Sequence, residues 1–216
     1  MTTLTLLLAS ATCPIPSRAA PEAQAGGLDA GALVAGLKRP APAHTAYAEV
    51  RFSGLLDRPL ILHGELEYEG PGKLAKTVTA PYRERTTIES GEASVQRGDK
   101  AVRKFSLGQA PELEGFLRGF TALLGGDAQA LQKDFEVTAS GRSDAWRLTL
   151  KPRDNRLAKR ITAIEVDGTG TSARCFSTHE ADGDVNVLLV ESLAEAKLPT
   201  RPTEPMIDAL CRGISR

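Results

Sequence analysis

The sequence predicts a mainly β protein with a few helices (α+β), organised around one antiparallel sheet, and three observations carry this prediction. Short segments in which apolar and polar residues alternate recur along the chain, as expected for half-buried strands. Dipeptides such as Asp167-Gly168 and Asp182-Gly183 separate several of these segments and favour tight turns. Long helices do not alternate with the strands, so the sequence lacks the β-α-β units that a parallel sheet needs.

The composition fits a single domain and argues against several classes of ligand. The chain has 216 residues, of which 41% are hydrophobic, enough for one sizeable core. Lysine and arginine total 27, as do aspartate and glutamate, so no net charge attracts nucleic acid. Aromatic residues make up only 5% of the chain, and no basic segment is interleaved with them. We therefore expect no nucleic acid partner.

Residues 1–25 have the pattern of a secretory signal peptide. An apolar run from Leu4 to Ala11 is followed by small residues and by an Ala-x-Ala site that ends at Ala25. The positive charge that usually precedes such a run is missing here. A membrane anchor is the alternative, but the run is far shorter than the roughly 20 residues that a spanning helix needs. We expect residues 26–216 to form one mature domain in the periplasm.

The mature chain is expected to begin with a helix and a strand. In residues 28–37 apolar side chains recur at helical spacing, and Pro40 prevents the helix from continuing. Residues 45–53 alternate as a strand does. One face of that strand carries Ala46, Ala48, Val50 and Phe52, and the other carries Tyr47, Glu49 and Arg51. We expect the apolar face, with Val50 and Phe52, to line a core or a cavity.

The clearest strand pair spans residues 59–82. On the first strand one face carries Leu60, Leu62, Leu66 and Tyr68, with Gly64 between them. Residues 69–72 (Glu-Gly-Pro-Gly) interrupt the pattern as a turn, and the alternation then resumes at Leu74. An isolated strand pair cannot bury its apolar face, so other segments must cover that face or leave it open for a ligand.

The strongest helix signal lies in the middle of the chain, at residues 111–124. Pro111 suits a first helical turn, and Gly125-Gly126 supplies a stop. One face of this helix carries Leu113, Phe116, Leu117, Phe120 and Leu124. Such a continuous apolar face must cover a large apolar surface.

Further strands are expected on both sides of this helix. The alternating segments are 82–89, 93–97 and 101–107 before it, and 135–139, 146–151, 161–167, 174–180 and 185–190 after it. With the earlier ones they make about eleven strands. Asp127 can cap a short helix that runs to Lys133, and the tail is weakly helical from Thr203.

Three cysteines are present, and cleavage of the signal peptide removes Cys13. Cys175 and Cys211 remain, and an even number of cysteines in an oxidising compartment favours a disulfide between them. Two unrelated buried thiols are the alternative.

Catalytic and metal-binding motifs are missing from the sequence. His44, His63 and His179 do not have the spacing of metal ligands, and Glu65 and Glu67 are expected on an exposed strand face. Residues 168–173 formally match a dinucleotide-binding fingerprint, but a strand rather than a helix follows them. We therefore expect no enzyme activity, no metal and no cofactor.

The strand pair also carries a family resemblance, in the order Gly64, Leu66, Tyr68, Pro71 and Leu74. This pattern resembles the periplasmic lipoprotein carrier family LolA. The resemblance implies an unclosed, strongly curved antiparallel β-barrel covered by helices, with an apolar cavity that takes up acyl chains. It makes residues 111–124 the lid of that cavity. The dedicated carrier has an arginine that controls lid closure at the position of Gly70, so that control is in doubt here.

This resemblance and the strand patterns together define the expected lipid site. The expected cavity and lid residues are Val50, Phe52, Leu60, Leu62, Leu66, Tyr68, Leu113, Phe116, Leu117, Phe120, Leu124 and Trp146. The expected ligands are the acyl chains of lipoproteins or another apolar lipid. The expected partners are an inner-membrane donor and an outer-membrane acceptor, with the carrier itself a monomer.

Two other classes of function stay open at this point. A periplasmic scaffold would keep the helix at 111–124 docked on a fully packed core, and a periplasmic hydrolase would need a catalytic site that the sequence does not show. An apolar cavity of several hundred Å³ beneath the helix would favour the carrier.

Overall fold

The computed structural model describes residues 28–214, except for the side chains of residues 111–113. Eleven strands make up most of it: β1 (Ala43–Phe52), β2 (Leu60–Gly70), β3 (Lys73–Ala80), β4 (Glu84–Glu89), β5 (Glu92–Arg97), β6 (Arg103–Ser106), β7 (Phe135–Arg142), β8 (Ala145–Pro152), β9 (Ile161–Thr169), β10 (Ser172–Glu180) and β11 (Val185–Val190). The helices are α1 (Ala30–Gly36), α2 (Pro111–Gly125), α3 (Ala128–Asp134), α4 (Asn155–Ala158) and α5 (Glu204–Cys211), with 3-10 turns η1 (Leu107–Gln109) and η2 (Glu191–Leu193).

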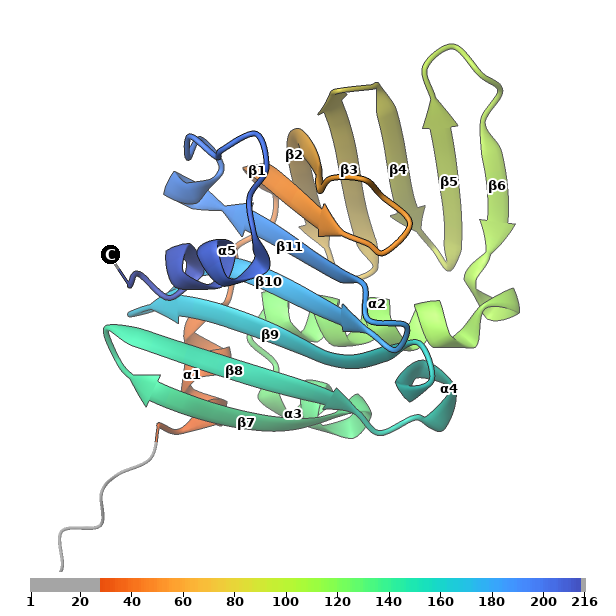
Figure 1. The fold of residues 1–216 in the computed structure, drawn as a ribbon. Coiled ribbons are helices and arrows are strands. Elements are labelled where there is room, and N and C mark those ends of the chain that lie inside the picture. Colours follow the sequence, from red (N-terminus) through yellow and green to blue (C-terminus); the bar gives the residue numbers. More distant parts are fainter. Residues whose placement is uncertain (1–27, 215–216) are drawn as a thin grey trace, which may run out of the picture.

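All eleven strands belong to one antiparallel sheet in the order β6-β5-β4-β3-β2-β1-β11-β10-β9-β8-β7 (Figure 1). Strands that are consecutive in the sequence are neighbours, except β6 and β7, and β1 pairs with β11 in the centre. The edge strands β6 and β7 do not pair with each other, so the sheet stays open. The mainly β fold, the antiparallel order and the strand count are therefore confirmed.

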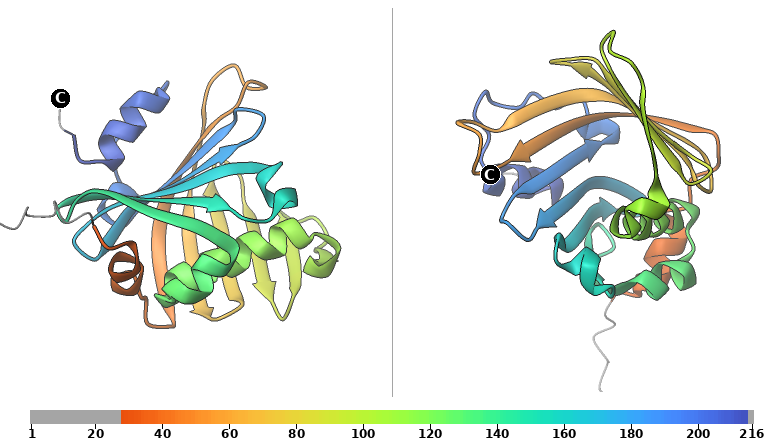
Figure 2. Two further views of the ribbon diagram at one scale, coloured as in Figure 1. Left: turned by 90° about the horizontal axis from the view of Figure 1, so that it is seen from below. Right: turned by 90° about the vertical axis from the view of Figure 1, so that its right-hand side faces the viewer.

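The sheet is strongly curved and bends round α2, as the two views of Figure 2 show. One point of close approach lies at Gly64, where a Cβ atom would be 1.8 Å from the carbonyl oxygen of Thr77 on β3 and 3.0 Å from the ring of Tyr47. Only glycine leaves room there for both the neighbouring backbone and the tyrosine ring. We call the face that carries Tyr47 the inner face of the sheet, and the opposite face the outer face.

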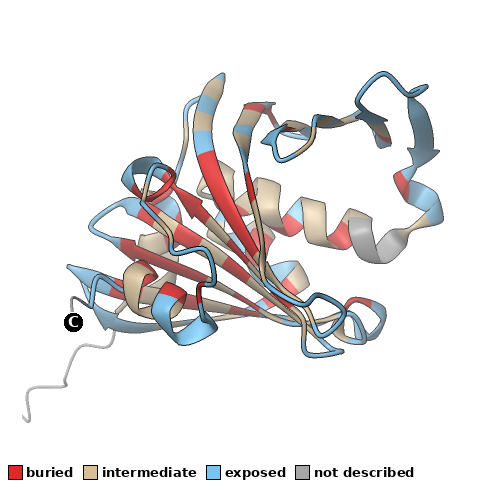
Figure 3. Ribbon diagram, turned by 45° about the horizontal axis from the view of Figure 1, so that its top comes forward, coloured by how far each residue is buried: buried red, intermediate tan, exposed pale blue. Residues whose placement is uncertain are grey.

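Helices fill the inner face at the β7–β9 end of the sheet. The core there contains Val34 and Leu37 of the α1 region, Leu123 of α2, Leu131 of α3, Leu157 of α4, and Phe135, Trp146, Leu148, Leu150, Ile164, Val166 and Ala173 from the strands. This part of the inner face is buried against side chains, and Figure 3 shows buried residues along β8 and β9 as well as along the central strands β1, β10 and β11.

A second core lies on the outer face, where α5 covers β1, β10 and β11. It contains Ala48, Val50, Cys175, Val185, Val187, Leu189, Leu193, Ile207 and Cys211. Figure 2 shows α5 on the opposite side of the sheet from α1, α2 and α3. The predicted disulfide is confirmed, because Cys175 on β10 is bonded to Cys211 on α5.

An ion cluster also ties α5 to the outer face. The guanidinium of Arg147 on β8 lies 2.8 Å from Asp167 and 2.9 Å from Glu165. It also contacts Asp208 of α5 at 2.5 Å. One arginine is thus the shared cation of three carboxylates at this junction.

Some elements differ from their predicted bounds. The strand expected from residue 82 begins at Glu84, and the strand expected from residue 101 begins at Arg103. The short helix α4 was not predicted, although Asp154 caps it through the amides of Arg156 and Leu157. Within residues 28–214, no helix combines the length and the hydropathy that crossing a membrane requires.

Candidate functional site

A cavity of about 570 Å³ lies between α2 and the inner face of the sheet. On the helix side it is lined by Phe116, Leu117, Phe120, Leu123 and Leu124. On the sheet side its apolar lining comes from Leu66, Tyr68, Leu74, Val78, Ile88, Ile164, Phe176, Leu188 and Val190. A volume of this size is typical of binding sites for small ligands.

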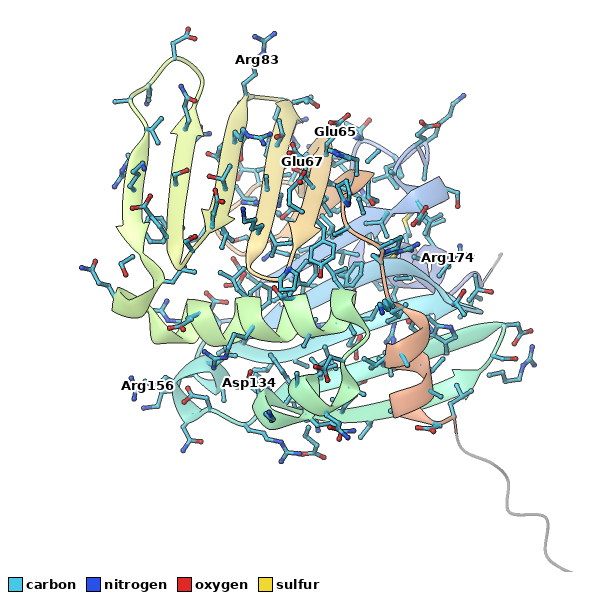
Figure 4. All side chains as sticks on the ribbon, turned by 180° about the vertical axis from the view of Figure 1, so that it is seen from behind. Glu65, Glu67, Arg83, Asp134, Arg156 and Arg174 are labelled. Carbon is cyan, nitrogen blue, oxygen red and sulfur yellow. A yellow bond between two sulfur atoms is a disulfide. The ribbon has the colours of Figure 1, made fainter. Side chains whose placement is uncertain are left out.

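The position of α2 follows from its ends and its contacts. Pro111 occupies the first turn, and Gly126 ends the helix in the left-handed conformation with φ of 69°. Arg118 on its solvent side lies 3.2 Å from Asp134 at the end of α3. Figure 4 shows Asp134 beneath α2, next to α4. The other side of α2 therefore faces the sheet.

Aromatic rings connect α2 to the sheet across the cavity. The rings of Phe116 and Phe120, one turn apart, lie 6.4 Å from each other and nearly parallel. Phe120 meets Phe176 of β10 edge to face, with ring centroids 5.7 Å apart. Such arrangements are favourable, and they set one wall of the cavity.

A charged cluster also lines the cavity. Lys76 Nζ lies 2.5 Å from Glu49 Oε2, and Arg51 Nε lies 2.8 Å from Glu49 Oε1. Glu49 is only 5% exposed. Lys76 Nζ also stands 5.1 Å from the ring centroid of Tyr47, a favourable cation–π position. We call Glu49, Arg51 and Lys76 the cavity triad.

The triad keeps Glu49 ionised. Burial raises the pKa of Glu49, but the charge of Lys76 and the hydrogen bonds from Arg51 and Lys76 together hold that pKa below its usual value. The neighbouring Tyr47 hydroxyl is buried and has no hydrogen-bond partner among the described residues. Burial, followed by the charge of Glu49, raises the pKa of Tyr47, so this hydroxyl stays protonated.

Six of the twelve expected cavity residues line this cavity: Leu66, Tyr68, Phe116, Leu117, Phe120 and Leu124. Two separate segments of the sequence, β2 and α2, are therefore brought together round one space. The side chain of Leu113 lies outside the described part of the structure.

The expectation for β1 was wrong, because the strand presents its other face to the cavity. Val50 belongs to the outer-face core beneath α5, and Phe52 packs against that core. One face of β1 packs against α5 and the other faces the cavity. The apolar face is therefore buried in the outer-face core and does not line the cavity. The more polar face, with Glu49 and Arg51, lines the cavity instead.

Trp146, Leu60 and Leu62 do not line the cavity either. Trp146 is 2% exposed, lies in the core beneath α1 and α3, and donates a hydrogen bond from Nε1 to the carbonyl of Gly170 at 2.8 Å. Leu62 pairs with Glu49 and Leu60 with Arg51, so both lie on the inner face, and Leu62 is fully buried beside the triad.

Sequence reasoning missed several cavity residues. Phe176 could have been found, since it alternates with Cys175 in a predicted strand and an aromatic residue on the inner face is a natural lining group. The sequence alone could not predict the triad, because Lys76 is on β3 and comes close to Glu49 only through the pairing of β1, β2 and β3.

The described residues hold no group of three or more histidine, cysteine, aspartate or glutamate side chains that could bind a metal ion. His44 and His63 are exposed. His179 lies 3.4 Å from Glu165, and both belong to the network around Arg147. The histidines are thus placed apart from one another.

A family model described as outer membrane lipoprotein carrier protein LolA-like matches residues 20–214. The chain belongs to this family. The match covers the strands of both cavity walls, α2 and α5, so the whole described fold is a LolA-like fold. No curated protein matches the sequence.

Solved structures with a similar fold share little sequence with this LolA-like chain. A LolA superfamily protein from Nitrosomonas europaea is 11% identical, covers 80% of this chain and 96% of its own, and has a TM-score of 0.42. An outer membrane lipoprotein-sorting protein domain from Vibrio parahaemolyticus is 10% identical, with 86% and 98% covered and a TM-score of 0.40. The MucA/MucB complex of Pseudomonas aeruginosa matches at 15% identity, with 83% and 60% covered and a TM-score of 0.38. These scores are low, and the family assignment rests on the sequence match.

Proposed function

We propose that this LolA-like protein is a carrier without enzyme activity that binds the acyl chains of lipoproteins, or of a related lipid, in the cavity beneath α2. The observation that carries the proposal is the cavity itself, about 570 Å³ with phenylalanine and leucine side chains of α2 along one wall. A scaffold with a fully packed core would have no such cavity beneath α2.

The physical basis of binding would be burial of hydrocarbon. Each methylene moved from water into an apolar site contributes about 0.8 kcal/mol, so ten methylenes contribute about 8 kcal/mol before the costs of association. Acyl chains could therefore bind with useful affinity and still be released to an acceptor, without a covalent step, a metal or a cofactor.

The same proposal assigns the protein to the periplasm. Family membership and the disulfide between Cys175 and Cys211 point to an extracytoplasmic compartment. The proposed signal peptide, residues 1–25, lies outside the described residues, and residues 26–216 would be the mature domain. There the carrier, a monomer, would collect its lipid from an inner-membrane donor and deliver it to an outer-membrane acceptor.

Gly70 stands at the end of β2, where the dedicated carrier has an arginine. Its φ of 130° is a conformation that glycine adopts more readily than any other residue. The end of α2 is held in another way, because the amide of Arg39 donates a hydrogen bond to the carbonyl of Leu124 at 2.8 Å. We propose that closure of this cavity does not depend on an arginine at position 70.

Native mass spectrometry of gently purified protein tests for a bound lipid, and titration with a fluorescent fatty acid tests for saturable binding. Phe120→Asp and the milder Phe120→Ala should each weaken binding strongly, because both remove apolar lining and the first adds a charge. Leu55→Asp is the matched control, since Leu55 is 95% exposed and does not line the cavity.

Circular dichroism must show that the Phe120 variants are folded. If folded wild-type protein shows neither co-purified lipid nor saturable binding, the carrier proposal is wrong. Equal binding by wild type, Phe120→Ala and Leu55→Asp would move the lipid site away from α2.

A further inference from the structure

We propose that the cavity binds an amphiphile with one hydrocarbon chain and an anionic head, and that Arg51 and Lys76 bind the head. The inference rests on the proposed function and names the class of lipid. The head would be a carboxylate or a phosphate monoester, because both accept hydrogen bonds from a guanidinium and an ammonium group.

The first argument is the charge balance of the cavity lining. The charged lining residues outside the triad each have a partner of opposite charge within the described structure. Arg39 lies 2.8 Å from Glu191, Glu67 lies 2.6 Å from Arg85, and Glu84 lies 3.9 Å from Arg97. Figure 4 shows Glu67 on β2. The triad has two cations and one anion, so it leaves one positive charge facing the cavity.

The second argument is the supply of free donors. Arg51 uses Nε for its hydrogen bond to Glu49, and neither of its two terminal amino groups donates a hydrogen bond to a described residue. Lys76 gives one of its three ammonium protons to Glu49. A planar pair of free amino groups matches the two oxygens of a carboxylate or phosphate.

The third argument is the distribution of polar groups along the cavity. Arg51 pairs with Asn186 on β11, and Asn186 pairs with Thr178 on β10, so three polar lining residues lie side by side on the inner face. Ala43, eight positions before Arg51 on β1, also lines the cavity, next to Tyr68. At about 3.3 Å per residue these two lining positions of β1 are about 26 Å apart along the strand.

A site for hydrocarbon alone would gain nothing from this arrangement. Removing a charge from water is unfavourable unless a partner compensates it, and a buried Glu49 can neutralise only one of its two cations. An anionic head placed against Arg51 and Lys76 would complete the balance, while its chain ran toward Tyr68 and the phenylalanines of α2. One molecule that is apolar at one end and negative at the other would both fill the apolar part of the cavity and neutralise the remaining positive charge of the triad.

The test compares four ligands that share a twelve-carbon chain: dodecanoate, dodecyl phosphate, dodecanol and dodecyltrimethylammonium. Each is titrated into delipidated mature protein below its critical micelle concentration. We expect at least one of the two anions to bind about tenfold or more tightly than dodecanol, since hydrogen bonds to charged groups are the stronger ones. The cation should bind most weakly. Comparison of dodecanoate with dodecyl phosphate identifies the preferred head.

Three variants locate the effect. Arg51→Gln should remove most of the preference for the anion and leave dodecanol binding within about twofold. Glu49→Gln should strengthen the preference, because it raises the charge of the triad without removing a cation. Arg83→Gln is the matched control, since it changes the net charge equally and Arg83 points away from the protein at the turn between β3 and β4 (Figure 4).

The outcomes separate the two proposals. Equal affinity for dodecanol and both anions overturns the anionic head and leaves the hydrocarbon carrier in place. Binding of none of the four ligands counts against the carrier itself. If Arg51→Gln weakens dodecanol and the anions by the same factor, Arg51 supports only the shape of the cavity, and its proposed role is wrong.

Discussion

Gly119 of α2 lies directly against the ring of Phe135 at the start of β7. A Cβ atom on residue 119 would be 2.1 Å from Cε2 of Phe135, far closer than two carbon atoms can approach. Phe135 is fully buried and belongs to the core beneath α1 and α3. The distance between α2 and the sheet, and with it the height of the cavity, is therefore set partly by a missing side chain.

Gly119→Ala should destabilise the protein, although alanine favours helix formation over glycine by about 1 kcal/mol. The added methyl group must displace either Phe135 or α2, and such overpacking typically costs about 1–3 kcal/mol. Urea unfolding measures the difference. Gly115→Ala is the control, because a Cβ there meets only the end of Arg118 at 3.7 Å, and it should stabilise. Equal gains in both variants would show that α2 is not seated on Phe135.

The apolar face of α2 and the inner face of β2 could be predicted from the sequence, for a physical reason. Helical spacing placed Phe116 and Phe120 on one face of α2. Because the other face is more polar, the apolar face was expected to face the sheet. In β2 the same holds for Leu66 and Tyr68, whose alternate neighbours are mostly glutamates. Where one face is apolar and the other charged, periodicity alone gives the orientation.

The orientation of β1 could not be predicted in this way. Alternation separates Val50 from Arg51, but it does not say which face lies inside when helices cover both sides of a sheet. The contact between Lys76 and Glu49 depends on strand pairing, and the burial of Trp146 depends on α1 and α3. The spacing of residues along one strand cannot predict any of these contacts, because each depends on a second strand or on a helix.

Arg147→Gln should destabilise the protein by about 3 kcal/mol, because it leaves Glu165, Asp167 and Asp208 facing one another without their shared cation. Asp167 is 1% exposed, so water cannot replace the lost partner. Arg142→Gln is the control, since its pair with Asp144 is exposed and should contribute less than about 1 kcal/mol. Chemical unfolding of both variants gives the two values. A similar small loss in each would mean that the Arg147 cluster does not hold α5.

Stability should depend on pH through His179. The hydrogen bond and charge of Glu165 raise the pKa of His179, and the bond to His179 lowers the pKa of Glu165. Protonated His179 therefore stabilises the folded state fully below its unfolded pKa of about 6.5, and this contribution is lost as the pH rises through the higher folded pKa. Urea unfolding from pH 5.5 to 9 should show the free energy difference between wild type and His179→Gln decreasing across that range. A constant difference would exclude the proposed coupling.

The double variant Cys175→Ser/Cys211→Ser should lose about 4 kcal/mol of stability. The disulfide joins residues 36 positions apart, and in the chain-entropy model a cross-link of that span restricts the unfolded chain by this amount. Wild type unfolded in the presence of a reductant is the control, and it should match the variant.

Ligand binding gives this disulfide experiment a second measurement. The disulfide lies in the outer-face core, and neither cysteine lines the cavity. Below its unfolding temperature the double variant should therefore bind a fatty acid as wild type does. If binding is lost while circular dichroism shows a folded sheet, then α5 and the outer face control the shape of the cavity. The two faces of β1 would then be coupled through the strand that separates them.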